Sequence, residues 1–229
     1  MNARTMRIRR KRDKRAAKDT PRIVRRERRR AQSREEILDA ARRVVMRDGP
    51  SATLDAVAAE VGLTKAALYY YFPSRDALVF ELVYRIYEAE ANAVKRAVEP
   101  VKTGAEALAT LIRTTVMRHA SRMGDFRLAF LAGQVMPEPV KMLPEYFARI
   151  RPLNDLTYGD ATRKLEKEGG RSRSGVPPRR LAFLAHIAAI GLLTIKGMVE
   201  KVGDPLLYSD EQLISDLAKI FAAAAAPTG

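Results

Sequence analysis

The sequence predicts an all-α protein of about nine helices, and three observations support this fold class. Segments with the alternating pattern of a β-strand are nearly absent, whereas apolar residues recur at helical spacing along the chain. Residues that typically begin and end helices bracket these segments. With 229 residues, 47% of them hydrophobic, the chain is long enough to bury a core in one or two domains.

The first predicted helix begins at Ser33, because Glu36 three residues later completes a capping box. Gly49-Pro50 ends it, since glycine accepts the left-handed terminal conformation and proline cannot continue the hydrogen-bond ladder. Its apolar stripe consists of Ile37, Leu38, Ala41, Val44 and Val45. The spacing of that stripe predicts that one side of this helix is buried.

Two short helices are predicted next. The first follows Thr53, a residue that favours the N-cap position, and ends at Gly62. The second follows Thr64, another N-cap residue, and runs through Phe72, after which Pro73-Ser74 breaks the chain. The predicted buried side of the first consists of Leu54, Val57, Ala58 and Val61.

A long helix is predicted over about residues 75–99, and residues 100–104 have the composition of a domain junction. The further predicted helices span about residues 105–120, 126–136, 144–168, 178–201 and 210–225. Pro152 is expected to kink or split the one that begins at 144. Ser209 and Gln212 form a capping box at the start of the last one.

Basic charge is concentrated at the N-terminus. Residues 1–30 hold 15 of the 42 Lys and Arg and 3 of the 27 acidic residues, so +12 of the net charge of +15 lies there. Such a segment favours a polyanion, either nucleic acid or an anionic membrane surface. It lacks the apolar stretch of a secretory signal, although a mitochondrial-type presequence would share its composition.

The two short helices and their glycine turn have the layout of a helix-turn-helix. The second of them has a packing face of Ala67, Leu68, Tyr71 and Phe72 and an opposite face of Lys65, Ala66, Tyr69 and Tyr70. The opposite face is suited to a DNA major groove, because lysine reaches guanine edges or phosphates and tyrosine donates to phosphate oxygens. Packing alone would also produce leucine and tyrosine at this spacing, but three consecutive tyrosines cannot all be buried on one helix.

Three consecutive stretches make this interpretation specific: TLDAVA at residues 53–58, VGLTKAALYYYF at 61–72 and PSRDAL at 73–78. They closely resemble the DNA-binding signature of the TetR/AcrR family of transcriptional regulators. The resemblance covers about residues 33–84, and the remainder of the chain matches only in the number and order of helices. It implies a three-helix DNA-binding domain, a divergent helical effector domain and a homodimer.

The resemblance also implies roles for single residues. Thr53 and Tyr69 would hold DNA phosphates, and Arg75 would grip the backbone at the start of the fourth helix. The residues implied at or near base edges are Thr64, Lys65, Ala66 and Tyr70. Ala67 would let the helix approach the bases closely, although relatives often have a hydroxyl residue there. Tyr71 stands where the family often has histidine.

We therefore expect three parts: a basic, disordered arm over residues 1–30, a DNA-binding domain over 31–91 with its reading unit at about 54–73, and a ligand-binding and dimerisation domain over 101–226. The arm is either a solubilising extension or a segment that contacts phosphates and the minor groove beside the operator. Many family members begin just before the first helix, so the arm departs from the family pattern.

The predicted helix over 178–201 is apolar on nearly every side, so all its sides must be covered. Leu181–Ile195 falls short of the ~20 apolar residues that a membrane-spanning helix needs, which favours a buried helix and no membrane contact. One flank is expected to meet a second subunit, with burial inside one subunit as the alternative. The expected dimer interface consists of Leu181, Leu184, Ala188, Leu192, Ile195, Leu213, Leu217 and Phe221.

An effector pocket is expected among the C-terminal helices, where a few polar residues stand in apolar settings. The candidates are His119, Gln134, Tyr146 and His186. The alternative is that each is a hydrogen-bonded polar residue of the core.

The leading hypothesis is a cytoplasmic, homodimeric regulator that a small-molecule effector releases from a near-palindromic double-stranded DNA operator. Repression and activation both fit the sequence. The alternatives are a nucleoid-type protein that coats DNA through its arm, and a helical small-molecule-binding protein without a DNA role. An enzyme is not expected, because no nucleotide-binding or metalloprotease motif occurs. The absence of cysteine and the presence of only 2 histidines argue against a metal site. No other cofactor is expected.

Overall fold

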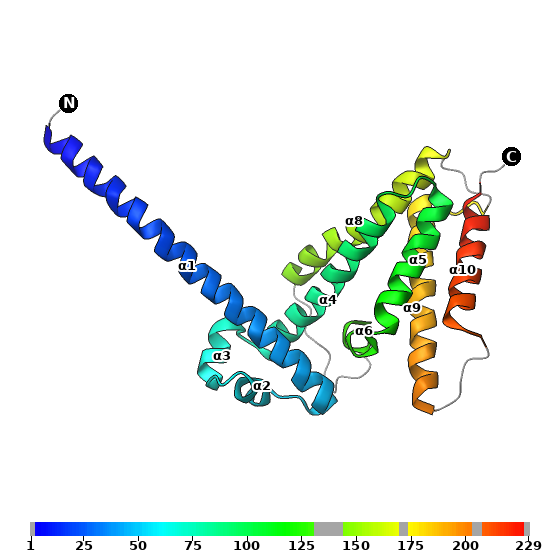
Figure 1. Ribbon diagram of the computed structural model, residues 1–229, viewed down its shortest axis with the longest axis horizontal. Helices are drawn as coiled ribbons and strands as arrows, with labels where there is room; N and C mark the ends of the chain where they lie inside the picture. Colours follow the sequence, from blue (N-terminus) through cyan, green and yellow to red (C-terminus); the bar gives the residue numbers. More distant parts are fainter. Residues whose placement is uncertain (1–2, 131–143, 170–173, 203–207, 227–229) are drawn as a thin grey trace. The chain divides into compact units, whose positions relative to one another are not determined.

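The computed structural model describes residues 3–130, 144–169, 174–202 and 208–226 (Figure 1). Every regular element among them is helical, so the predicted all-α class is confirmed. The chain divides into two compact units, Met1–Leu78 and Val79–Gly229, with the division inside one long helix. The domain limits expected from the sequence, at residues 91 and 101, stay predictions.

The N-terminal unit contains three helices and a single 3-10 turn. They are α1 (Ala3–Asp48), η1 (Gly49–Ser51), α2 (Leu54–Glu60) and α3 (Lys65–Tyr71), and α4 (Arg75–Val98) begins within the same unit. The C-terminal part of α1 packs against η1 and α2, and α2 packs against α3 (Figure 1). The buried residues of this unit are Ile37, Leu38, Ala40, Ala41, Val44, Val57, Ala58, Leu68, Phe72 and Leu78. They include most of the apolar stripes predicted for the first three helices.

Helix α1 differs from its prediction at its N-terminus. It begins at Ala3, so the residues expected to form a disordered arm continue the first helix in the structure (Figure 1). Ser33 lies inside the helix, and Glu36 accepts a hydrogen bond from the side chain of Gln32 at 3.0 Å instead of capping a helix start. The physical reason is that residues 22–32 are mostly arginine, glutamate, alanine and glutamine, which favour helix. A capping box at Ser33 therefore does not start a new helix where the residues before it are already helical.

The C-terminal unit consists of helices arranged around α5. They are α5 (Gly104–Ala120), α6 (Met123–Phe130), α8 (Pro144–Lys167), α9 (Pro178–Val202) and α10 (Asp210–Ala225), together with most of α4. Helix α5 packs against α6, α8, α9 and α10, and α9 also packs against α8 and α10 (Figure 1). The fully buried Leu108, Leu111, Ile112, Phe126 and Leu193 are the centre of this core.

Several helix ends in this unit were predicted and one was missed. The capping box of Ser209 and Gln212 is present at the start of α10. A second capping box, Thr103 with Glu106, starts α5 and was not identified from the sequence. Helix α6 begins at Met123, before the predicted start near 126. Helix α8 continues through Pro152 as one element, so the predicted split does not occur.

The composition of α9 fits either a membrane-spanning helix or a buried core helix. Pro178–Val199, 22 residues, is long and apolar enough to cross a membrane by length and composition, so it exceeds the length allowed in the sequence analysis. One side of α9 nevertheless lies in the core of the C-terminal unit, where Ala182, Ala185, Ala189 and Leu193 are fully buried. The helix is therefore a packed element of a helical domain with one exposed side.

Candidate nucleic-acid interface and ligand cavity

Helices α2 and α3 are held at their starts by the two predicted caps. The hydroxyl of Thr53 accepts a hydrogen bond from the backbone N–H of Ala56 at 3.1 Å, and the hydroxyl of Thr64 accepts one from that of Ala67 at 3.2 Å. Gly62 sits in the turn between them with a φ of +67°, in the left-handed region that favours glycine. The two helices thus form a helix-turn-helix with a short, locally determined turn.

Helix α3 divides into the two faces predicted from its sequence. Leu68 is fully buried, and Phe72 directly after the helix is 1% exposed. The residues on the opposite side, Lys65, Ala66, Tyr69 and Tyr70, are all exposed, and Tyr70 is 65% exposed. Ala67 and Tyr71 are half-buried between the two faces. The arrangement anchors the helix by its apolar side and leaves a polar and aromatic side open to a partner.

The exposed face includes an ion pair that the sequence analysis did not identify. The Nζ atom of Lys65 lies 2.9 Å from Oδ2 of Asp55 on α2, and both side chains are largely exposed. The hydrogen bond to Asp55 raises the pKa of Lys65 above its ordinary value. In the free protein the Lys65 ammonium group of α3 is therefore paired with the Asp55 carboxylate of α2.

Helix α1 brings arginines to the end of α3. The guanidinium of Arg30 lies 5.1 Å from the ring centroid of Tyr70. That of Arg34 lies 4.5 Å from the centroid of Phe72 and donates to the backbone carbonyl of Tyr71 at 2.8 Å. Beyond Arg30 toward the N-terminus, residues 22–29 are all exposed and include five arginines and one glutamate. A basic helical segment therefore adjoins the exposed face of α3 within the same unit.

The other predicted DNA contacts, Thr53, Thr64 and Arg75, differ in exposure. Thr53 and Thr64 are exposed, but each hydroxyl already accepts a capping hydrogen bond, so a phosphate would be bound by its remaining donor capacity. Arg75 is the first residue of α4 and is half-exposed. These positions agree with a DNA-facing surface and do not test it.

The C-terminal unit contains a cavity of about 310 Å³. Its lining comes from α4, α6, α8 and α9 and is mostly apolar and aromatic. The lining residues are Tyr87, Glu90, Phe130, Ile150, Leu153, Asn154, Thr157, Tyr158, His186, Ile187 and Ile190. The volume is at the low end of the range for small-molecule sites.

A buried carboxylate with two histidines lies at this cavity. Glu90 is 2% exposed, and its Oε2 lies 3.1 Å from Nε2 of His119 while its Oε1 lies 3.9 Å from Nδ1 of His186. Among the residues that the structure describes, none is aligned as a hydrogen-bond partner of Glu90 Oε1, His119 Nε2 or His186 Nδ1. Burial lowers the pKa of His186 below its ordinary value, so that the ring is neutral at neutral pH. Glu90 is thus a buried acid whose hydrogen-bonding capacity is not fully used.

Burial also shifts the pKa values of two tyrosines at this cavity, Tyr87 and Tyr158. Burial, with a further contribution from Glu90, raises the pKa of Tyr87 to about 12 and that of Tyr158 to about 12. Both phenols are therefore neutral at physiological pH. The Tyr87 hydroxyl donates to the backbone carbonyl of Ala129 at 3.0 Å, which fixes that ring in the wall of the cavity.

The predicted pocket residues are only partly brought together. His186 lines the cavity, and His119 lies behind Glu90 in the core. Tyr146 is elsewhere, stacked on Phe80 with ring centroids 3.8 Å apart, so its expected place in the pocket is not supported by the lining. Gln134 lies outside the described residues. Sequence reasoning missed Glu90, although an acid on the stripe of Val83, Tyr87 and Val94 was a usable signal.

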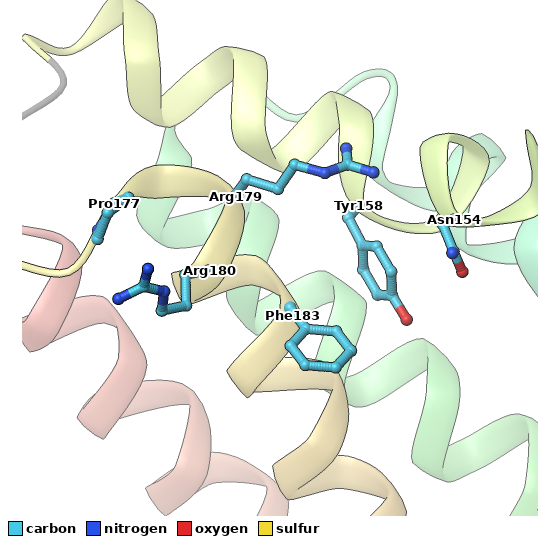
Figure 2. Close-up of a pocket in the computed structure, with 6 residues that line it drawn as sticks. All are labelled: Asn154, Tyr158, Pro177, Arg179, Arg180 and Phe183. Carbon is cyan, nitrogen blue, oxygen red and sulfur yellow. The ribbon is translucent and has the colours of Figure 1, made fainter. Parts of the chain in front are cut away.

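A second cavity of about 420 Å³ adjoins the first, and the two share Asn154 and Tyr158. Figure 2 shows Tyr158 beside Phe183, with the side chain of Arg179 extending toward Tyr158. Arg179 and Arg180, from the start of α9, both line this cavity. Arg179 forms an ion pair with Asp155 at 2.7 Å. This cavity is the more basic of the two.

The expected dimer residues fall into three groups. Leu181 is 2% exposed and belongs to the core of its own subunit, which removes it from any surface. Leu184 and Ile195 are exposed on α9, next to the exposed Ile187 and Met198. The half-buried residues of the set are Ala188, Leu192, Leu213, Leu217 and Phe221. Ile220, which is 62% exposed, extends the apolar surface onto α10 and was not in the predicted interface set.

Comparison with known proteins agrees with this architecture. A family model described as bacterial regulatory proteins of the tetR family matches residues 37–82. No curated protein matches the sequence. The matched residues contain the helix-turn-helix and the start of α4, so the family signature and the exposed face of α3 coincide.

Solved structures resemble the chain over most of its length. A TetR family transcription regulator from Marinobacter aquaeolei VT8 has 23% sequence identity and a TM-score of 0.62, with 87% of this chain and 97% of that chain covered. The transcriptional regulator FadR from Bacillus subtilis, in complex with stearoyl-CoA, has 14% identity and a TM-score of 0.63, with 83% and 98% covered. A tetR-family regulatory protein from Rhodococcus RHA1 has 18% identity and a TM-score of 0.62, with 86% and 98% covered.

At these identities the structures show the fold, whereas the family model shows the signature of the N-terminal helices. The family model matches the N-terminal helices, the solved structures cover most of the chain, and both name the same family. The family prediction made from residues 53–78 is thereby confirmed: the protein has the fold of the TetR family of transcription regulators and carries that family's N-terminal domain.

Proposed function

We propose that the protein is a sequence-specific, DNA-binding transcriptional regulator that acts as a homodimer and is controlled by a small molecule. The observation that carries the proposal is the exposed face of α3, with Lys65, Ala66, Tyr69 and Tyr70 directed outward while Leu68 anchors the helix. Lysine and tyrosine on an exposed recognition helix can contact base edges and phosphates in a major groove.

Dimerisation is supported by the apolar surface on α9 and α10. Leu184, Ile195 and Ile220 are exposed on helices that pack against each other. A two-fold axis would bury the same patch of both subunits and give two reading helices, as a near-palindromic site requires. The two half-sites would be separated by about one DNA turn, roughly 34 Å.

Control by a small molecule is supported by the cavity that Glu90 and His186 line. The Bacillus subtilis FadR of similar fold was crystallised in complex with stearoyl-CoA, so a fold of this type accommodates an organic ligand. Helix α4 provides Tyr87 and Glu90 to the cavity and begins at Arg75, a few residues after α3. A ligand that shifts α4 would change the separation of the two reading helices and release DNA. We propose repression as the direction of control.

The proposal includes the three-part layout, with DNA contacts in residues 1–91 and ligand binding and dimerisation in 101–226, to which Tyr87 and Glu90 of α4 add two residues of the cavity lining. It also places the protein in the cytoplasm, associated with the nucleoid, and assigns it no enzymatic activity, cofactor or membrane contact. A second candidate, a DNA-coating protein, is favoured by one observation, the exposed arginines of residues 22–30.

The test is selection of bound DNA from a random pool, followed by footprinting on the selected sequence. A regulator yields a near-palindromic site that is bound at least about a thousand-fold more tightly than random DNA. Lys65→Ala with Tyr70→Ala should abolish this preference, whereas Lys95→Ala, an exposed lysine on α4, should leave it intact. Sequence-independent coverage, or selectivity that survives the double substitution, would reject the proposal, and the former would favour the DNA-coating candidate.

A further inference from the structure

We propose that the ligand of the Glu90 cavity is an organic cation, an amine with an apolar body, whose ammonium group binds the Glu90 carboxylate. This inference rests on the proposed effector site and names the chemical class of the ligand. It is carried by the buried, incompletely bonded Glu90, by the aromatic rings around it and by the absence of a competing cation in the described lining.

A carboxylate at Glu90 would be incompletely bonded by the described residues. The residue is only 2% exposed, it lines the cavity, and its Oε1 atom has no hydrogen-bond partner among the described residues. A buried charged group without a full set of partners costs free energy, and an ammonium group that donates to Oε1 would remove that cost. A ligand that carries a positively charged donor would therefore gain the most binding free energy at this cavity.

The described groups that face Glu90 do not supply a positively charged donor to its Oε1 atom. His119 lies at Oε2, on the side away from Oε1, and is not aligned for a hydrogen bond. His186 is the nearest group to Oε1, at 3.9 Å, and its burial disfavours the protonated form. The hydroxyl of Tyr87 is used by Ala129. Within the part of the chain that the structure describes, the lining contains no lysine or arginine.

The aromatic rings at the cavity suit the same group. Phe130 lies edge-on to Tyr87 with centroids 4.9 Å apart, and Tyr158 lies 5.4 Å from the ring of His186. The faces of such rings attract ammonium groups, and the attraction is strongest where water is excluded. The aliphatic residues Ile150, Leu153, Ile187 and Ile190 complete the lining and would cover an apolar body.

The same features disfavour an anionic ligand at this position. A carboxylate in the cavity would lie close to Glu90, and two unpaired like charges in a buried site repel each other strongly. The arginine-lined second cavity is the place where an anionic group would bind instead (Figure 2). The chemistry of the two cavities is thus opposite although they share Asn154 and Tyr158.

The experiment compares three probes of equal carbon number, octylamine, octanol and octanoate, on the full-length protein by isothermal titration calorimetry near pH 7. Octylamine should bind at least about ten-fold more tightly than octanol, because a charged hydrogen bond in a dry site is worth more than a neutral one, and octanoate should not bind there. This comparison needs no variant. Equal affinity for the amine and the alcohol would overturn the inference, whereas octanoate bound in the arginine-lined second cavity should be unaffected by Glu90→Gln.

Variants locate the binding. Glu90→Gln should weaken octylamine at least about ten-fold and octanol little, because the substitution removes the charge and keeps the shape. Glu88→Gln, an exposed acid on the same helix, is the matched control and should change neither affinity. Retention of the amine preference in Glu90→Gln would contradict the inference.

Different experimental results would reject this inference and the proposed function. If the protein selects a DNA site but octylamine neither binds in the calorimeter nor shifts the melting temperature, only the ligand class is wrong. If no selective DNA site is found, the proposed regulator is wrong, whatever the amine does.

Discussion

The guanidinium of Arg30 lies 5.1 Å from the ring centroid of Tyr70, so an arginine of α1 contacts a tyrosine of the exposed face of α3. A cation over an aromatic ring in this range is attracted by the ring's charge distribution. The contact fixes the basic part of α1 next to the face that we propose to read DNA. The exposed arginines of residues 22–29 continue the same helix beyond Arg30 and are candidates for phosphate contacts.

Replacement of Arg25, Arg26, Arg28 and Arg29 by glutamine should weaken DNA binding for selected and random sequences alike. Each lost phosphate contact should reduce the slope of log affinity against log salt by about 0.9, because fewer counterions are released. Fluorescence anisotropy over a salt series measures both effects. The matched control, Lys95→Gln with Arg96→Gln, changes two exposed cations of α4. An unchanged slope in the quadruple variant would show that the segment does not contact DNA.

Replacement of Asp55 by asparagine should strengthen DNA binding. Asp55 holds Lys65 at 2.9 Å in the free protein and adds a negative charge to the exposed surface, so its removal frees the lysine and removes repulsion of phosphates. We expect the affinity for random DNA to rise several-fold at low salt and the gain to shrink as salt screens the charges. Electrophoretic mobility shifts at two salt concentrations measure this. A loss of affinity would mean that the ion pair is part of the bound state.

Replacement of Thr64 by alanine should destabilise the protein by about 0.5–2 kcal/mol, because the N–H of Ala67 loses the hydroxyl that caps α3. Thr64→Ser keeps the hydroxyl and should retain most of the stability. Urea unfolding followed by circular dichroism gives the free energies. Equal stability of the alanine and serine variants would mean that the cap does not contribute.

Replacement of Ile195 or Ile220 by glutamate should dissociate the proposed dimer. Both side chains are exposed in the single subunit, at 49% and 62%, and a charge placed in a buried two-fold interface lies near its own copy. Analytical ultracentrifugation gives the oligomeric state. Met117→Glu is the matched control, since Met117 is 57% exposed but lies on α5. A dimer that persists in both variants would place the interface elsewhere.

The free energy of unfolding should fall as the pH drops below about 6.5. His186 has a folded-state pKa below its ordinary value because burial disfavours the charged ring, so in this range the unfolded chain takes up a proton that the folded protein does not. Chemical unfolding between pH 7.5 and about 5 measures the slope. His186→Asn removes this contribution, so the variant should show a flatter dependence. An equal slope in the two proteins would contradict the prediction.

Much of the fold was predictable because its signals are local. The caps at Thr53, Thr64 and Ser209 are hydrogen bonds that span three residues, and each is present where the sequence predicts it. The two faces of α3 follow from the spacing of Leu68 and Phe72, since apolar side chains three or four residues apart lie on one side of a helix. Gly62 marks the turn for the same kind of reason.

The cavity was predictable only in part. His186 was identified as a polar residue in an apolar segment, and it does line the cavity, whereas Tyr146 satisfied the same criterion and packs on Phe80 instead. Periodicity shows which side of a helix is covered but not by which neighbour it is covered. For this reason Glu90, whose partners come from α5 and α9, was missed.

The sequence by itself determined most of the helices from Gly49 onward, the helix-turn-helix and the side of α3 that is exposed, because hydrogen bonds and periodicities within a few residues dictate them. Only the tertiary structure decided that Leu181 is covered by its own subunit, that Arg30 meets Tyr70, and that an acid and two histidines from three helices share one buried site. These relationships join residues far apart in the chain. They depend on how whole helices pack, and no short stretch of sequence encodes that packing.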